Sequence, residues 1–160
     1  MVERAAAAMG ITNGTVKGDI ALAGGKPHVI ELAARLSGGY FCTLMIPLNT
    51  GVDFVGNTVR LALGEPVDTG ALLPQFQQSM AQRYIFPEPG NVSQIKGVEE
   101  ARDLPGIAHI VVSAEIGDII PPALNTTARA AMILATGDTV DEARASAAKA
   151  IEAIEIKIEP

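Results

Sequence analysis

The sequence predicts an α+β fold, in which a β-hairpin and helix lobe packs on a small antiparallel-sheet domain. Three observations predict it: two alternating runs around Gly24–Gly25, short apolar runs cut by proline and glycine from residue 81, and a capped amphipathic helix near the C-terminus. Alternation with period two indicates half-buried strands, and a glycine pair between two such runs is typical of a hairpin. We expect a domain boundary near residue 70, which gives domains of residues 1–70 and 71–160.

The first half of the chain predicts a helix, a hairpin and a second helix. Residues 2–9 are rich in alanine and end at Gly10, as a short helix does. Residues 14–36 form the two alternating runs of the hairpin. Apolar residues then recur at helical spacing over 52–63, and residues 67–79 predict a loop.

The second half predicts antiparallel strands around one small helix at residues 98–103. Thr139 with Glu142 three residues later has the spacing of a capping box, so we expect a helix to begin there. Residues 154–158 alternate and predict a last strand. The other predicted strands lie within residues 81–92, 106–122 and 123–137.

The composition is that of a globular protein and excludes several functions. Of 160 residues, 48% are hydrophobic and 19% charged, so a core can form without disulfides. The formal net charge is −6 and lysine and arginine do not cluster, so we expect no nucleic-acid partner. The single cysteine, Cys42, permits no intramolecular disulfide, and no segment reaches the roughly 20 apolar residues of a membrane span. We expect a cytoplasmic chain with no membrane partner.

The predicted hairpin has one apolar face and one charged face. Strand side chains alternate between faces. In the first strand, Lys17 and Asp19 therefore share a face. In the second strand, Val29, Glu31 and Arg35 share one. An ordinary solvated face with a weak Arg35–Glu31 surface pair is one interpretation of these charges.

The register decides whether the two acids meet. A loop of three or five residues places Asp19 opposite Glu31, whereas a two-residue Gly24–Gly25 turn pairs Asp19 with Ile30. Pro27 has no amide donor for a ladder and favours the longer loop. Facing carboxylates repel each other. A divalent cation would convert that cost into binding, because Mg²⁺ commonly takes one or two carboxylates with phosphate oxygens.

The order of these features resembles a known family. A helix ending AAAAMGITNG, an acidic strand, a glycine turn and VIELAARLSGG resemble the C-terminal lobe of the ATP-grasp fold, and GVDFVGNTVRLALGEPV resembles the next segment. Residues 81–158 resemble the C-terminal antiparallel domain of the same enzymes. The E-x-A-x-R form of Glu31 to Arg35 is similar to the L-amino-acid-ligase-like carboxylate–amine ligases. Carbamoyl-phosphate synthetases and biotin carboxylases favour asparagine at the position of Ala33.

The resemblance implies an enzyme that phosphorylates a small carboxylate with ATP and then lets an amine attack the acyl phosphate. Carried over by position, Asp19 and Glu31 would bind Mg²⁺, or Mn²⁺ in its place, on the ATP phosphates. Arg35 would be the catalytic residue, stabilising the transferring phosphoryl group and the acyl phosphate. The remaining cofactor-binding positions are Lys17 and the backbone amides around Ser37, Gly38 and Gly39.

Two positions depart from the family's pattern. Ala33 stands where many members have an asparagine that also contacts metal, and Asp19 replaces the commoner glutamate. The N-terminal and central lobes that cover the adenine and triphosphate do not lie within these 160 residues. We therefore expect the last third of a longer enzyme, or a subunit of a split one, inactive alone and with apolar surface that favours self-association. The alternatives are a non-catalytic dimerisation or assembly module derived from the fold, and a carbamoyl-phosphate-synthetase or biotin-carboxylase relative.

A few other residues invite functional interpretations. Cys42 is expected to be a buried apolar residue rather than a nucleophile. The Tyr40–Phe41 pair is expected in the core, with the substrate cleft as the alternative. Asp53 has the position of a helix N-cap. Arg83 and Arg129 are expected in surface or domain-interface pairs, with contact to a substrate carboxylate as the alternative.

Overall fold

A computed structural model describes residues 1–159, which divide into two compact units, Met1–Gln77 and the residues from Gln78 onward. The boundary predicted after residue 70 lies inside the first unit. All the sheets of the described residues are antiparallel, with two strands in the first unit and two sets of three strands in the second. The predicted α+β class is confirmed.

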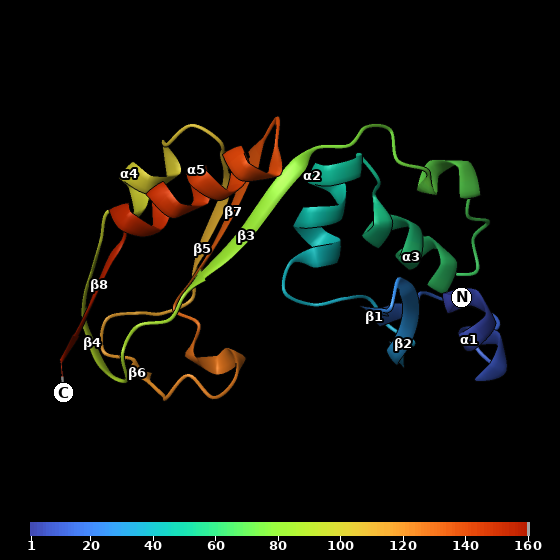
Figure 1. Ribbon diagram of the computed structural model, residues 1–160, viewed down its shortest axis with the longest axis horizontal. Coiled ribbons are helices and arrows are strands. Elements are labelled where there is room, and N and C mark those ends of the chain that lie inside the picture. The colour runs from blue at the N-terminus through green and yellow to red at the C-terminus, as the bar shows by residue number, and fades with distance from the viewer. Residues whose placement is uncertain (160) are drawn as a thin grey trace. The chain divides into compact units, whose positions relative to one another are not determined.

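The first unit begins with the predicted helix and hairpin. Helix α1 (Val2–Ala8) is followed by Gly10 with a φ of +73°. Strands β1 (Lys17–Ala23) and β2 (Lys26–Ala33) form the hairpin, with α1 packed beside it (Figure 1). Both turn glycines have positive φ, 57° and 70°, which is the backbone of a two-residue type I′ turn.

The register of the hairpin corrects the prediction of a longer loop. Ala23 pairs directly with Lys26 across the turn, so the loop has two residues. Pro27 is tolerated because each strand of a two-stranded sheet is an edge strand, where a missing donor leaves no ladder bond unmade. A β-bulge then shifts the register by one residue, so that Asp19 still lies opposite Glu31.

The bulge also changes which residues share a face. Val29 pairs with Ile20 and lies on the apolar face, not on the charged face as predicted. Ile30, the extra residue of the bulge, is 70% exposed. Beyond the bulge the alternation is as expected, because Glu31 keeps the face of Asp19.

The segment after β2 contains helices that the alternation did not predict. Tyr40, with φ of +64°, precedes a π-helical turn, η1 (Phe41–Met45), which continues into α2 (Ile46–Thr50). Helix α3 (Phe54–Ala62) follows and confirms the helix predicted over 52–63. A short 3₁₀ helix, η2 (Thr69–Leu72), lies in the predicted loop.

Helix α3 begins where its sequence predicts. Asp53 is the N-cap, and its Oδ1 accepts a hydrogen bond from the Gly56 amide at 2.8 Å. This bond satisfies one of the free donors of the first turn. The prediction that Asp53 caps this helix is therefore confirmed.

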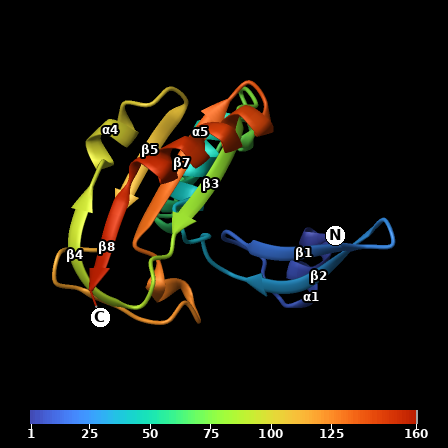
Figure 2. The same ribbon diagram turned by 60° about the vertical axis from the view of Figure 1, so that its left-hand side comes forward.

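The core of the second unit lies between a three-stranded sheet and one helix. Strands β3 (Ser79–Ile85), β7 (Ala131–Gly137) and β5 (Ile107–Val112) lie in the order β3-β7-β5. Helix α5 (Val140–Ala153) crosses one face of this sheet (Figure 2). Its buried alanines bring the helix close to the strands. The core residues on the two sides are Ala81, Ile110, Ile133, Ala135, Ala143, Ala147 and Ala150.

A second small sheet completes this unit. Strands β6 (Ile119–Ile120), β4 (Gly90–Lys96) and β8 (Glu155–Glu159) lie in that order, and α4 (Val98–Arg102) follows β4. Gly97 between β4 and α4 has φ of +76°, and a Cβ there would collide with the carbonyl oxygen of Ala153. The close approach of the two chain segments thus requires glycine.

One predicted strand is shorter than expected. The run 123–137 is a strand only over β7, and its first part contains a 3₁₀ helix, η3 (Thr126–Ala128). The reason is local, because Asn125 Oδ1 accepts the Thr127 amide at 2.8 Å and turns the backbone. Within residues 1–159, no helix is long and apolar enough to cross a membrane.

Candidate functional site

The charged face of the hairpin brings together three of the residues predicted from the sequence. Lys17 Nζ lies 2.5 Å from Asp19 Oδ2 and 3.5 Å from Glu31 Oε1. The register makes this possible, because Asp19 and Glu31 are direct cross-strand partners on one face. The two carboxylate oxygens are at most 6.0 Å apart, which is the sum of their distances to Nζ.

The ammonium of Lys17 therefore lies between the carboxylates of Asp19 and Glu31. The hydrogen bond to Asp19 raises the pKa of Lys17 above its ordinary value of 10.5. The charges of Asp19 and Glu31 act in the same direction and partial burial opposes them. Lys17 is thus a cation at neutral pH. Its charge offsets the repulsion between the two facing acids.

A pocket of about 430 Å³ adjoins this face within the first unit. The charged side chains at its wall are Lys17, Asp19 and Arg35. Arg35 is exposed, and its Nη1 donates to the carbonyl oxygen of Leu36 at 3.0 Å. The Arg35–Glu31 surface pair of the sequence interpretation is not formed among the described residues, and Glu31 pairs with Lys17 instead. The other lining residues are Val16, Gly18, Leu36, Ser37, Phe41, Cys42, Ile46 and Phe54.

The loop that follows Arg35 differs from the simple phosphate-binding turn that the sequence predicts. The Ser37 amide donates to Cys42 Sγ at 3.2 Å, and Cys42 is only 3% exposed. Gly38 and Gly39 are exposed, and neither lines the pocket. Gly38 has open space around the position of a Cβ, so a ligand can approach its backbone closely. The Ser37 amide, by contrast, is already engaged.

Sequence reasoning missed part of the apolar wall. Ile46 and Phe54 line the pocket, and Cys42 lines it and holds the loop. The aromatic pair at 40–41 is not in the core as expected, because Tyr40 is 41% and Phe41 46% exposed, and Phe41 lines the pocket. These residues come from η1, α2 and α3, and the two helical segments before α3 had no periodic signal in the sequence. The burial predicted for Cys42 is confirmed.

The donor set fits a divalent cation that is only partly held by protein. Asp19 and Glu31 offer carboxylate oxygens, the ligands that Mg²⁺ prefers. Across residues 1–159, no cluster of three or more His, Cys, Asp or Glu side chains lies in metal-binding range. Ala33, which pairs with Lys17 across the hairpin, adds no ligand. A cation here would take its remaining ligands from water or from phosphate oxygens.

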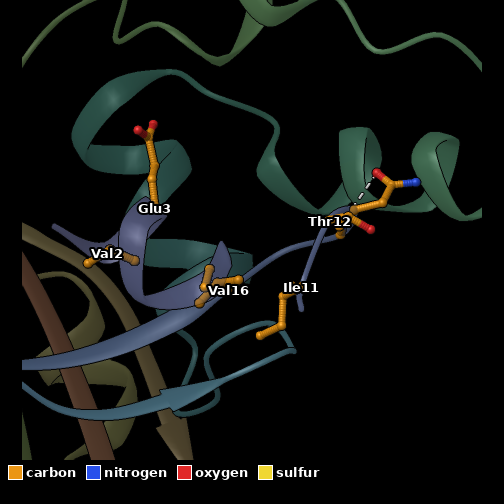
Figure 3. A pocket seen from close by; sticks show the side chains of 8 residues that line it. Val2, Glu3, Ile11, Thr12 and Val16 are labelled. Atoms are coloured by element: carbon orange, nitrogen blue, oxygen red, sulfur yellow. Dashed lines mark hydrogen bonds between the residues drawn. The ribbon is translucent and has the colours of Figure 1, made fainter. Parts of the chain in front are cut away.

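A second hollow of the first unit lies between α1 and the segment that leads to β1. It has a volume of about 280 Å³. Val2 and Glu3 come from α1, and Ile11, Thr12 and Val16 come from that segment (Figure 3). Glu3 is its one charged side chain, so this hollow has no set of groups for a reaction.

Comparison with known proteins finds a family model over most of the second unit and the same fold over both units. Residues 83–159 match the family model described as L-amino acid ligase C-terminal domain 2. The solved structure of the L-amino acid ligase from Bacillus licheniformis superposes with a TM-score of 0.82, at 21% identity, over 99% of this chain and 39% of that one. The phosphoribosylglycinamide synthetase of Anaerococcus prevotii gives 0.85, at 21% identity, over 99% of this chain and 40% of that one.

The predicted resemblance to the C-terminal portion of ATP-grasp ligases is confirmed. The identities are low, so the superpositions establish the ATP-grasp C-terminal fold and not a substrate. The curated relative y4rH, an uncharacterised protein of Sinorhizobium fredii, is 26% identical over the whole chain. The chain spans 33% of that relative. It therefore aligns with only a part of each of these longer chains.

Proposed function

We propose that this chain is the C-terminal part of an ATP-dependent carboxylate–amine ligase and that its hairpin binds the metal-bound phosphates of ATP. The observation that carries the proposal is the cross-strand pairing of Asp19 with Glu31, whose carboxylates both contact the ammonium of Lys17. The family model over residues 83–159 supports a ligase. The activity itself, and small carboxylate and amine substrates, are proposals for the longer enzyme.

Each residue of the charged face has a separate task in this proposal. Asp19 and Glu31 hold the cation through carboxylate oxygens, and when bound, Mg²⁺ neutralises phosphate charge as a Lewis acid. Arg35 lies at the wall of the same pocket and is exposed, so its guanidinium can move to a phosphoryl group. A planar fork of donors suits the charge of a transferring phosphoryl group and of an acyl phosphate.

Lys17 has the second positive charge of the pocket. Its side chain is 21% exposed and lines the cavity, so its ammonium can reach either the acids or a ligand. When a divalent cation takes the two carboxylates, Lys17 donates to phosphate oxygens instead. The exposed backbone of Gly38, next to the pocket residue Ser37, has open space around it for a ligand, while the Ser37 amide stays with Cys42.

A binding experiment on the 160-residue chain tests the metal assignment. Mn²⁺, a paramagnetic substitute for Mg²⁺, is expected to broaden the backbone resonances around Asp19 and Glu31 in a heteronuclear NMR spectrum. The double variant Asp19→Asn, Glu31→Gln should lose this broadening. Asp141→Asn is the matched control, because Asp141 pairs with Arg144 on the surface of α5. Broadening that survives the double variant, or that is as strong at Asp141, contradicts the assignment.

An activity assay tests the ligase reaction on a longer protein that contains this sequence. ADP release should require a carboxylate and an amine together, and Arg35→Ala should reduce it by about 100-fold or more while leaving Mn²⁺ binding intact. ADP release that needs no amine would point to a carboxylase-like relative.

A non-catalytic assembly module is the second candidate, and Ala33 favours it because it removes a possible metal ligand. That candidate predicts neither Mn²⁺ binding at the hairpin nor ADP release. The two experiments therefore separate loss of the metal site from loss of the reaction.

A further inference from the structure

One arginine of the second unit stacks on an aromatic ring and has no acidic partner. The guanidinium carbon of Arg129 lies 3.9 Å from the centroid of the Tyr84 ring. The Ala130 amide donates to the carbonyl oxygen of Ile85 at 2.9 Å, which fixes the backbone beside the end of β3. Tyr84 alternates with Ile85, which packs in the α5 core, so the stack lies on the opposite face of the sheet.

The charge of Arg129 is not balanced inside the described chain. None of the acidic residues within 1–159 forms an ion pair with it, and its Nε is buried without a hydrogen-bond partner. Leaving a buried donor unsatisfied costs about 1–3 kcal/mol. By contrast, Arg102 and Arg144 pair with acids three residues before them, Glu99 and Asp141. Within residues 1–159, the Arg129 guanidinium thus stacks on a ring and forms no ion pair.

The chemistry around Arg129 selects a class of ligand. A guanidinium whose face is covered by a ring presents its donors in one plane, and a planar carboxylate accepts two of them at once. Phe86 lies beside Tyr84, with ring centroids 6.3 Å apart, and is 46% exposed. An apolar or aromatic body attached to the carboxylate would cover this ring. Free phosphate would gain nothing from it.

We propose that Arg129, held on the Tyr84 ring, binds the carboxylate of a small organic acid beside the half-exposed ring of Phe86. No residue of the first unit takes part in the argument. The inference therefore stands or fails separately from the proposed ATP site.

The test follows the Arg129 side chain directly by NMR. In the ¹⁵N-labelled 160-residue chain, the Nε–H resonance of Arg129 is followed during titration with benzoate, inorganic phosphate or chloride at equal ionic strength. We expect a saturable shift with benzoate, weaker binding of phosphate, and no saturable shift with chloride. The Nε–H of Arg144, which is paired with Asp141, is the internal control and should not move.

Three variants separate binding from folding. Arg129→Gln removes the charge, Arg129→Lys keeps the charge without the fork, and Tyr84→Leu removes the ring. Each should weaken benzoate binding about tenfold or more, because the two Arg129 variants lose charged hydrogen bonds of the fork and Tyr84→Leu loses the ring that holds the guanidinium. Backbone shifts of Phe86 report binding where the arginine is absent, and circular dichroism reports folding. If a variant does not fold, the titration of the unchanged chain with benzoate and phosphate is enough to support or overturn the inference.

Three results would overturn the inference. They are an Arg129 resonance that does not respond to benzoate, phosphate binding that is as tight as benzoate binding, and benzoate binding that survives in folded Arg129→Gln. The first two results require only the unchanged chain.

Discussion

Tyr40 is the non-glycine residue of the described chain with a left-handed backbone, at φ of +64°. For an L-residue this conformation costs roughly 1–2 kcal/mol, and glycine avoids it at a smaller entropic cost. The side chain is 41% exposed, so its removal costs little packing. We predict that Tyr40→Gly raises the free energy of unfolding by about 0.5–1 kcal/mol, measured by urea denaturation.

Tyr40→Ala is the control for this prediction. It removes the same ring and keeps the strained backbone, so it should give no gain in stability. Equal unfolding midpoints for Tyr40→Gly and Tyr40→Ala would show that the backbone at this position stores no strain. A release of strain at residue 40 would also loosen the turn before η1, whose residues Phe41 and Cys42 line the pocket.

Lys17 gives the second prediction at this scale. Its ammonium contacts both acids of the proposed metal site, so a divalent cation must displace it. Lys17→Met removes this competitor and leaves two facing carboxylates uncompensated. We predict that Mn²⁺ binds the variant roughly several-fold more tightly than the unchanged chain, measured by calorimetry without nucleotide. Lys17→Arg, which keeps a cation, should bind as the unchanged chain does. Weaker binding to Lys17→Met would mean that Lys17 supports the metal site.

Among the elements, α5 is the one whose start is best defined by sequence. Thr139 Oγ1 accepts the Glu142 amide at 3.2 Å, and Glu142 accepts the Thr139 amide at 3.2 Å in return, which completes the predicted capping box. Thr139→Ala should lower the stability of the second unit by about 1 kcal/mol, measured by thermal denaturation. Thr139→Ser keeps the hydroxyl and should stay near the unchanged chain. Equal losses in both variants would assign the effect to the threonine methyl group.

The elements also explain what the sequence can and cannot predict. Local signals predicted α1, α3, α5 and the hairpin, because caps, glycine turns and periodicity act over a few residues. The helices η1 and α2 were not predicted from the sequence. The π-helical turn η1 begins after Tyr40, whose backbone is left-handed, and its apolar residues do not recur at the spacing of an α-helix. Asn125 delayed the start of a predicted strand, because its Oδ1 accepts the Thr127 amide and turns the backbone before β7. Hydrogen bonds from such side chains to the nearby backbone compete with the hydrogen bonds of a strand, and the pattern of apolar residues does not show which of the two forms.

The hairpin shows the same limit at the candidate site. Sequence reasoning placed Asp19 opposite Glu31 but expected a longer loop to do so. The structure reaches that pairing through a two-residue turn and a bulge. A bulge adds one residue to one strand, and alternation cannot locate it. The acids could therefore be predicted as a pair, with Lys17 on the face of Asp19, whereas the ion pairs of Lys17 and the apolar wall from η1, α2 and α3 required the structure.

At the scale of the whole molecule, the chain matches only part of the length of its relatives. It spans 33% of y4rH and about two fifths of the two superposed structures. Its proposed metal site has two carboxylates and no third acidic, histidine or cysteine ligand among residues 1–159. Phosphate oxygens or water must supply the remaining ligands of a six-coordinate Mg²⁺. In the proposed ligase, groups that hold adenine and the triphosphate would come from other parts of the longer enzyme.

This incompleteness leads to a prediction about activity. The 160-residue chain alone should release no ADP above background from Mg²⁺–ATP, a carboxylate and an amine, because positioning and electrostatic stabilisation both need a held nucleotide. Supplying, as a separate protein, the region that precedes this sequence in its longer relatives should restore ADP release. Restoration should fail with Arg35→Ala and persist with Arg144→Gln, a change on the surface of α5. Turnover by the chain alone that Arg35→Ala abolishes would mean that this part holds ATP unaided, and the division of tasks proposed for these enzymes would not apply to it.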